Sequence, residues 1–134
     1  MSLDIHISER EGIVVLTLKG RITVGESTVL REKVTEQLTA AKINMIIDLG
    51  AVEYIDSTGL GSMVICFTSA KKAGGAMKLF ALNKRNVELL ALTRLHTIFE
   101  VFAEEQDAIN SFFPNREIKP FDILAFVKAH QQED

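Results

Sequence analysis

The sequence has little of several features that mark whole classes of protein. It holds one cysteine, Cys66, which excludes an internal disulfide and a cysteine-based zinc site and fits a reducing compartment. Its longest apolar runs, such as residues 13–16, are far below the ~20 residues that span a bilayer. The first residues lack the charged start and apolar stretch of a signal peptide. We therefore expect a cytoplasmic protein without membrane insertion.

The sequence also lacks a large excess of charge of either sign. Fifteen Lys and Arg against eighteen Asp and Glu give a net charge of -3 over 134 residues. Lys71-Lys72 and Lys84-Arg85 are the only adjacent basic pairs, so no basic stripe is present to neutralise nucleic-acid phosphates. Three histidines and one cysteine at unrelated spacings make no metal-ligand set. We expect no nucleic-acid partner, no metal and no cofactor.

What is present begins with the pattern of a hairpin. Ile5 and Ile7 alternate with polar neighbours, as a half-buried strand requires. A second apolar run over 13–18 follows Glu11-Gly12, a dipeptide suited to a tight turn. The sequence therefore predicts two antiparallel strands at the N-terminus.

Helix-like and strand-like segments alternate after this hairpin. Apolar residues recur every fourth position over 26–41, which predicts an amphipathic helix. The nearly all-apolar run 45–49 predicts a central strand covered on both faces. Three parallel strands with right-handed crossovers follow, so we expect one α/β domain with a mixed central sheet. The remaining elements expected are a helix ending near residue 72, strands at 77–82 and 99–102, and helices at 83–93 and 104–113.

Both prolines of the chain, Pro114 and Pro120, lie beyond the last of these helices and predict a boundary. We divide the chain into a domain over 1–113 and a C-terminal extension over 114–134. The extension contains a short amphipathic helical segment that is too apolar for a solvated tail. It either packs back on the domain or docks on another chain. Its apolar residues are Phe121, Ile123, Leu124, Phe126 and Val127.

The densest chemical signal lies in residues 50–62, between the central strand and the next helix. Asp, Ser, Thr and Gly cluster here, and Asp56 or Ser57 is placed to cap the helix. Capping alone accounts for most clusters of this kind. An exposed Ser57 hydroxyl is also a chemically sensible phosphorylation site, because a phosphate at a helix N-terminus meets free amides and the positive end of the helix dipole. A partner interface that contains Asp56 or Glu53 of this chain would then suffer like-charge repulsion and desolvation.

Four motifs carry a family resemblance. They are Lys19-Gly20-Arg21-Ile22, the strand 46–49, the signature Tyr54-Ile55-Asp56-Ser57-Thr58-Gly59-Leu60-Gly61, and Lys71-Lys72-Ala73-Gly74-Gly75. Over residues 3–113 the chain resembles the STAS domains of bacterial anti-sigma factor antagonists. The resemblance implies the STAS fold. In that family an anti-sigma factor kinase phosphorylates the serine after the aspartate, which implies Ser57 as the phosphoacceptor, with Thr58 as the second candidate.

The resemblance also implies a binding module rather than an enzyme. The unphosphorylated protein would bind an anti-sigma factor serine/threonine kinase and so free a sigma factor for transcription. Phosphorylation would release the kinase, and a serine phosphatase would reset the switch. Gly59 and Gly61 are expected to let the kinase approach closely. The expected partner-binding residues are Thr23, Glu26, Ser27, Asp56, Ser57, Thr58, Gly59, Leu60, Gly61 and Ser62.

The chain departs from the family pattern at two places. Many members have an acidic or amide residue where this chain has Thr23, which affects partner recognition. Minimal members end near Phe113, so the extension adapts this chain to a particular partner or to self-association.

The residues fit other functions less well than an anti-sigma factor antagonist. A serine hydrolase needs a base near its nucleophile, but Ser57 lacks the Gly-x-Ser-x-Gly elbow and only His6, His96 and His130 are present. Only Gly59-x-Gly61 favours a nucleotide-binding site. The third glycine of a dinucleotide-binding motif and the lysine of a P-loop are both missing. STAS-like domains also act as non-switching scaffolds of stress-sensing complexes and as soluble regulatory subunits of membrane transport systems. The Asp56-Ser57 pair favours the switch.

Overall fold

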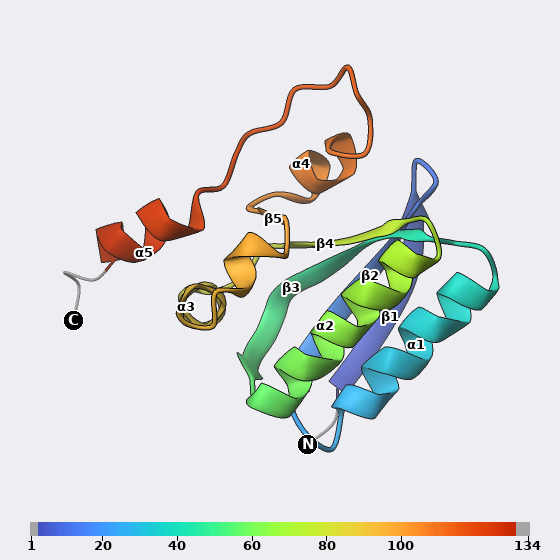
Figure 1. Cartoon of the computed structure of the whole chain (residues 1–134), viewed down its shortest axis with the longest axis horizontal. Helices are drawn as coiled ribbons and strands as arrows, with labels where there is room; N and C mark the ends of the chain where they lie inside the picture. The colour runs from blue at the N-terminus through green and yellow to red at the C-terminus, as the bar shows by residue number, and fades with distance from the viewer. Residues whose placement is uncertain (1–2, 131–134) are drawn as a thin grey trace.

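The computed structural model describes residues 3–130, and the last four residues of the predicted extension, 131–134, lie outside the described residues. Within this range a five-stranded sheet has the order β1-β2-β3-β4-β5 (Figure 1). Its strands are β1 (Leu3–Arg10), β2 (Ile13–Ile22), β3 (Asn44–Ile55), β4 (Ala76–Phe80) and β5 (Val101–Phe102). The helices are α1 (Ser27–Thr39), α2 (Ser57–Lys72), α3 (Lys84–Leu92), the 3-10 helix η1 (Leu95–Thr97), α4 (Glu105–Asn110) and α5 (Ile123–His130).

The hairpin forms where the sequence predicts it. β1 and β2 pair antiparallel with Arg10 opposite Ile13, and Glu11 and Gly12 form the two-residue turn. Both turn residues have positive φ, 53° and 81°, as a turn that matches the twist of the strands requires.

The sheet is mixed, as predicted, but it holds four parallel strands rather than three. β2 pairs parallel with β3, β3 with β4, and β4 with β5. The fourth parallel strand is β2. It pairs antiparallel with β1 in the hairpin, and because the helix α1 connects it to β3, it also pairs parallel with β3. Among the described helices none is long and apolar enough to cross a bilayer.

Helices cover the central strand on both faces, as its apolar run predicts. On one face, with α1 and α2, Met45 and Ile47 of β3 join the larger core. On the other face, Ile46 packs in a second cluster with Phe80, Phe102 and residues of α4. The alternation along β3 therefore separates two cores, and the structure confirms the α/β architecture.

β3 is longer than the predicted strand 45–49. It continues to Ile55 because the long strand β2 pairs with it as far as Ile22, across two shifts in register. The segment after Leu49 is thus an extended strand rather than a loop, and it delivers Asp56 and Ser57 directly to the start of α2.

The described part of the extension packs back on the domain, which is one of the two arrangements that its composition left open. α5 lies beside α3 (Figure 1). Ile123 is buried in the larger core, and Phe126 and Val127 pack against it. The apolar side chains of the extension are therefore partly used within this chain.

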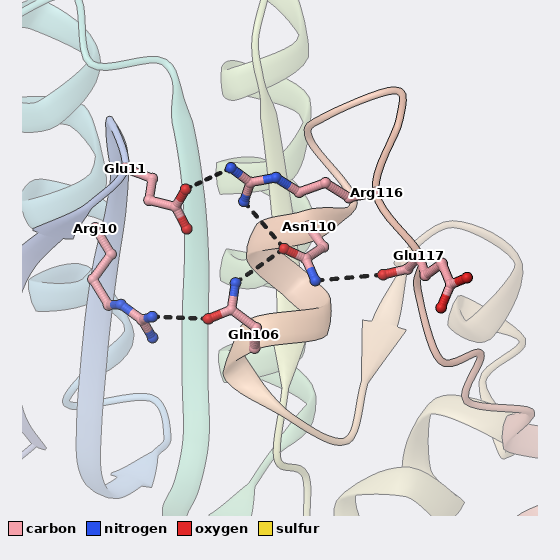
Figure 2. Close-up of polar contacts among 6 residues, drawn as sticks. All are labelled: Arg10, Glu11, Gln106, Asn110, Arg116 and Glu117. Carbon is pink, nitrogen blue, oxygen red and sulfur yellow. Dashed lines mark hydrogen bonds and ion pairs between the residues drawn. The ribbon is translucent and has the colours of Figure 1, made fainter.

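A polar network fastens the start of the extension to the hairpin turn and α4 (Figure 2). The Arg116 guanidinium binds the Glu11 carboxylate at 2.6 Å and donates to Asn110 Oδ1 at 3.1 Å. Asn110 Oδ1 also accepts from Gln106 at 2.9 Å, and Gln106 Oε1 accepts from Arg10 at 2.9 Å. These contacts hold the start of the extension against α4 and the hairpin turn.

Candidate functional site

Asp56 is the residue that caps α2. Its Oδ1 accepts the backbone N–H of Gly59 at 2.7 Å, and its Oδ2 accepts that of Val24 at 3.2 Å. The first bond satisfies a helix amide that has no partner in the first turn. The second comes from the loop between β2 and α1. One carboxylate therefore joins two segments that are 32 residues apart in the chain.

Ser57 is the first residue of α2 and is exposed, as is Thr58. Its hydroxyl makes no hydrogen bond within residues 3–130. The helix is 16 residues long and carries Lys71 and Lys72 in its last turn, so its charges complement the helix dipole at that end. Ser57 lies at the other end, the N-terminus of the helix, where the helix dipole and the amides of the first turn stabilise an added anion.

The loop beside Ser57 is ordered by its own hydrogen bonds. Thr23 Oγ1 donates to Glu26 at 2.5 Å, and the backbone N–H groups of Glu26 and Ser27 donate to the Thr23 carbonyl at 3.0 and 2.8 Å. The backbone N–H of Asp56 donates to the Ile22 carbonyl at 3.1 Å. Thr23 thus shapes the loop through its bond to Glu26.

Gly59 lies where α2 passes close to the end of β2. A Cβ at this position would overlap the carbonyl oxygen of Ile22, so glycine is required for α2 to pack against β2. Gly59 is buried by that contact. Gly61 differs, because it is exposed and a Cβ there would meet open space.

The other predicted partner-binding residues fall into two groups. Ser27, Leu60 and Ser62 are buried and support the site from within. The residues that reach the surface gather around the start of α2 and the loop between β2 and α1. They are Thr23, Glu26, Asp56, Ser57, Thr58 and Gly61.

The sequence reasoning missed two exposed side chains next to this surface. Val24 is 70% exposed and lies in the loop that Asp56 holds. Tyr54 is 39% exposed, and its ring lies 5.3 Å from the Arg85 guanidinium of α3. Tyr54 belongs to the signature segment, but the periodicity of a single sequence does not show which signature residues are exposed.

The nucleophilic and basic residues elsewhere are separated from one another. Cys66 is buried in α2, and desolvation raises the pKa of its thiol to about 11. His6 lies on β1, His96 on η1 and His130 at the end of α5. Between residues 3 and 130 no three His, Cys, Asp or Glu side chains gather as metal ligands would.

The sequence matches a family model described as the STAS domain over residues 4–108. The anti-sigma-B factor antagonist of Bacillus subtilis (strain 168) is 33% identical over 109 residues, which cover 81% of this chain and 99% of that protein. The anti-sigma-F factor antagonist RsfB of Mycobacterium tuberculosis is 26% identical over 113 residues, covering 81% of this chain and 88% of that protein.

Solved structures show the same fold. An anti-sigma-factor antagonist (STAS) domain protein from Planctomyces limnophilus superposes with a TM-score of 0.73 at 18% identity, covering 82% of this chain and 98% of that chain. The Bacillus cell fate determinant SpoIIAA in its phosphorylated form superposes with a TM-score of 0.64 at 16% identity, covering 81% of this chain and 99% of that chain.

Proposed function

The chain belongs to the STAS domain family, and on this basis we propose that it is an anti-sigma factor antagonist that phosphorylation of Ser57 switches off. The observation that carries the proposal is the exposed Ser57 hydroxyl at the start of α2, beside a capping Asp56. In its unphosphorylated form the protein binds an anti-sigma factor of the serine/threonine kinase type and thereby frees a sigma factor. It acts as a binding module, and the kinase supplies the catalytic groups.

The switch step is a phosphoryl transfer from ATP that is held by the kinase. Ser57 Oγ attacks the γ-phosphorus, the new P–O bond forms, and the bond to ADP breaks. The hydroxyl proton passes to a base on the kinase. The transfer adds a charge of roughly -1.5 to -2 next to Asp56. A serine phosphatase resets the switch by hydrolysing the phosphoserine to serine and inorganic phosphate.

The phosphate changes the surface without unfolding the domain. The unpaired amides at the start of α2 and the positive end of its dipole stabilise the new anion. A partner that packs over Ser57 and Thr58 meets like-charge repulsion and must also desolvate the phosphate. The affinity therefore falls while the fold persists.

The test uses the histidine-kinase-like anti-sigma factors of the source organism, each purified and mixed with the full chain and Mg-ATP. Intact mass is measured for the wild type, Ser57→Ala and the matched neighbour Thr58→Ala. We expect one kinase to add a single phosphate to the wild type and to Thr58→Ala but not to Ser57→Ala. Failure of every kinase to bind or phosphorylate the wild type would contradict the proposed function.

A further inference from the structure

A groove lies between α3 and the end of β3. One face of α3 presents Arg85, Glu88, Leu89 and Leu92 at positions i, i+3, i+4 and i+7, which is one side of a helix. Tyr54 and Ile55 of β3 form the opposite wall. These six residues line a cavity of about 230 Å³. Of the two leucines on this face, Leu89 packs against the larger core, whereas Leu92 is exposed.

Two large apolar side chains that line the groove are exposed. Leu92 is 83% exposed and Tyr54 is 39% exposed. Single exposed apolar residues are common on protein surfaces, whereas two large ones flanking one groove with a polar rim are typical of a binding site. An apolar side chain of a partner placed between them would remove both from water.

The rim of the groove carries a positive charge that is not neutralised. The Arg85 guanidinium lies over the Tyr54 ring and forms no ion pair with any residue from 3 to 130. The neighbouring charges are paired: Lys84 lies 3.9 Å from Glu88, and Arg21 lies 3.9 Å from Glu53. Arg85 is therefore the cation at this rim that is available to a carboxylate of a partner.

The groove lies next to the phosphoacceptor segment along the chain. Ile55 is followed directly by Asp56 and Ser57. The end of β3 is held against α3, because the side-chain amides of Asn83 and Asn86 donate to the Val52 carbonyl at 3.1 and 3.0 Å. The groove and Ser57 therefore keep a fixed relation, and one partner surface can contact both.

We propose that this groove is a second contact site for the same anti-sigma factor: it receives an apolar side chain between Tyr54 and Leu92 and a neighbouring carboxylate on Arg85. This inference rests on the proposed function. The groove does not include Ser57, so it supplies affinity that phosphorylation leaves intact. Its contribution therefore adds to that of the phosphoacceptor surface.

The test measures dissociation constants by calorimetry without ATP, with whichever purified anti-sigma factor binds the wild type. Leu92→Ser is expected to weaken binding about tenfold, as truncation of a central interface residue does. Leu124→Ser is the matched control, because Leu124 is also an exposed helical leucine, 57% exposed, but lies on α5 outside the groove. Arg85→Gln is expected to weaken binding by about threefold to tenfold. Arg31→Gln, on the exposed side of α1, is its matched control and should leave binding unchanged.

The outcomes separate the two proposals. If Leu92→Ser and Leu124→Ser bind the anti-sigma factor with equal affinity, the groove is not a contact site, and the proposed Ser57 switch is unaffected. Binding of no anti-sigma factor to the wild type would overturn both. Circular dichroism confirms that each variant is folded, which is expected because Leu92 is so exposed. The combined Ser57→Asp and Leu92→Ser variant should show the product of the two single losses.

Discussion

Asp56 accepts the backbone N–H of Val24 at 3.2 Å with the oxygen that does not cap α2. The loop before α1 and the start of α2 are therefore held by one side chain, immediately before the proposed phosphoacceptor. Because the same carboxylate serves both segments, a change at Ser57 acts on a surface whose two halves cannot separate freely.

The Asp56 carboxylate is expected to stabilise the fold through both of these bonds. Asp56→Ala removes the cap of α2 and the bond to Val24, and should lower the free energy of unfolding by about 1–2 kcal/mol. Urea denaturation measures the change. Asp4→Ala, an exposed aspartate on the edge strand β1, is the control and should be close to neutral. Equal stability of the two variants would show that Asp56 does not hold the site together.

Two glycines of α2 should respond in opposite ways to the same substitution. Gly59→Ala places a methyl group against the Ile22 carbonyl and should destabilise the protein by about 3 kcal/mol or more. Gly61→Ala meets open space and should stabilise it by up to about 1 kcal/mol, because alanine favours helix. Thermal and urea unfolding of both variants test this. Similar stabilities would contradict the close approach of α2 to β2.

The ion pair between Arg116 and Glu11 should change the pH at which the Glu11 carboxyl titrates. The hydrogen bond from Arg116 lowers the pKa of the Glu11 carboxyl below its ordinary value. A lowered pKa in the folded state means that the pair stabilises the fold above the unfolded pKa, and that this contribution is lost as the pH falls through the folded pKa. Arg116→Gln should raise the Glu11 pKa toward its ordinary value in an NMR titration. An unchanged pKa would show that Arg116 does not contact Glu11 in solution.

Cys66 should be unreactive in the folded protein. Burial raises the pKa of its thiol to about 11, so the thiolate that reacts with iodoacetamide is scarce at pH 8. Unfolding exposes a thiol with an ordinary pKa of about 8.5, so stability should fall as the pH rises above that value. Labelling should be slow in buffer and rapid in urea, and Cys66→Ala should lose the alkaline fall. Rapid labelling in buffer would contradict the buried position.

The local patterns of the sequence predict the fold well. The hairpin turn at Gly12, the apolar run through Ile46 and the cap at Asp56 each depend on residues close together in the chain. The fourth parallel strand and the length of β3 could not be predicted in this way, because they depend on how far β2 pairs with β3.

The site is less predictable than the fold, for the same reason. The cluster around Ser57 is visible in the sequence, but the burial of Gly59 depends on the Ile22 carbonyl, 37 positions away. Arg85 and Leu92 carry no signal that links them to Tyr54. The helical spacing of α3 shows an amphipathic face, and only the packing shows that this face borders a groove.

The switch is tested most directly by the affinity of the anti-sigma factor for the protein phosphorylated at Ser57, compared with the unphosphorylated protein at the same ionic strength. Phosphorylation is expected to lower this affinity about 100-fold, the effect of a few kcal/mol of repulsion and desolvation at the interface. Equal affinities of the two forms would contradict the switch, because Ser57 would then be an exposed helix-start residue without a switching role.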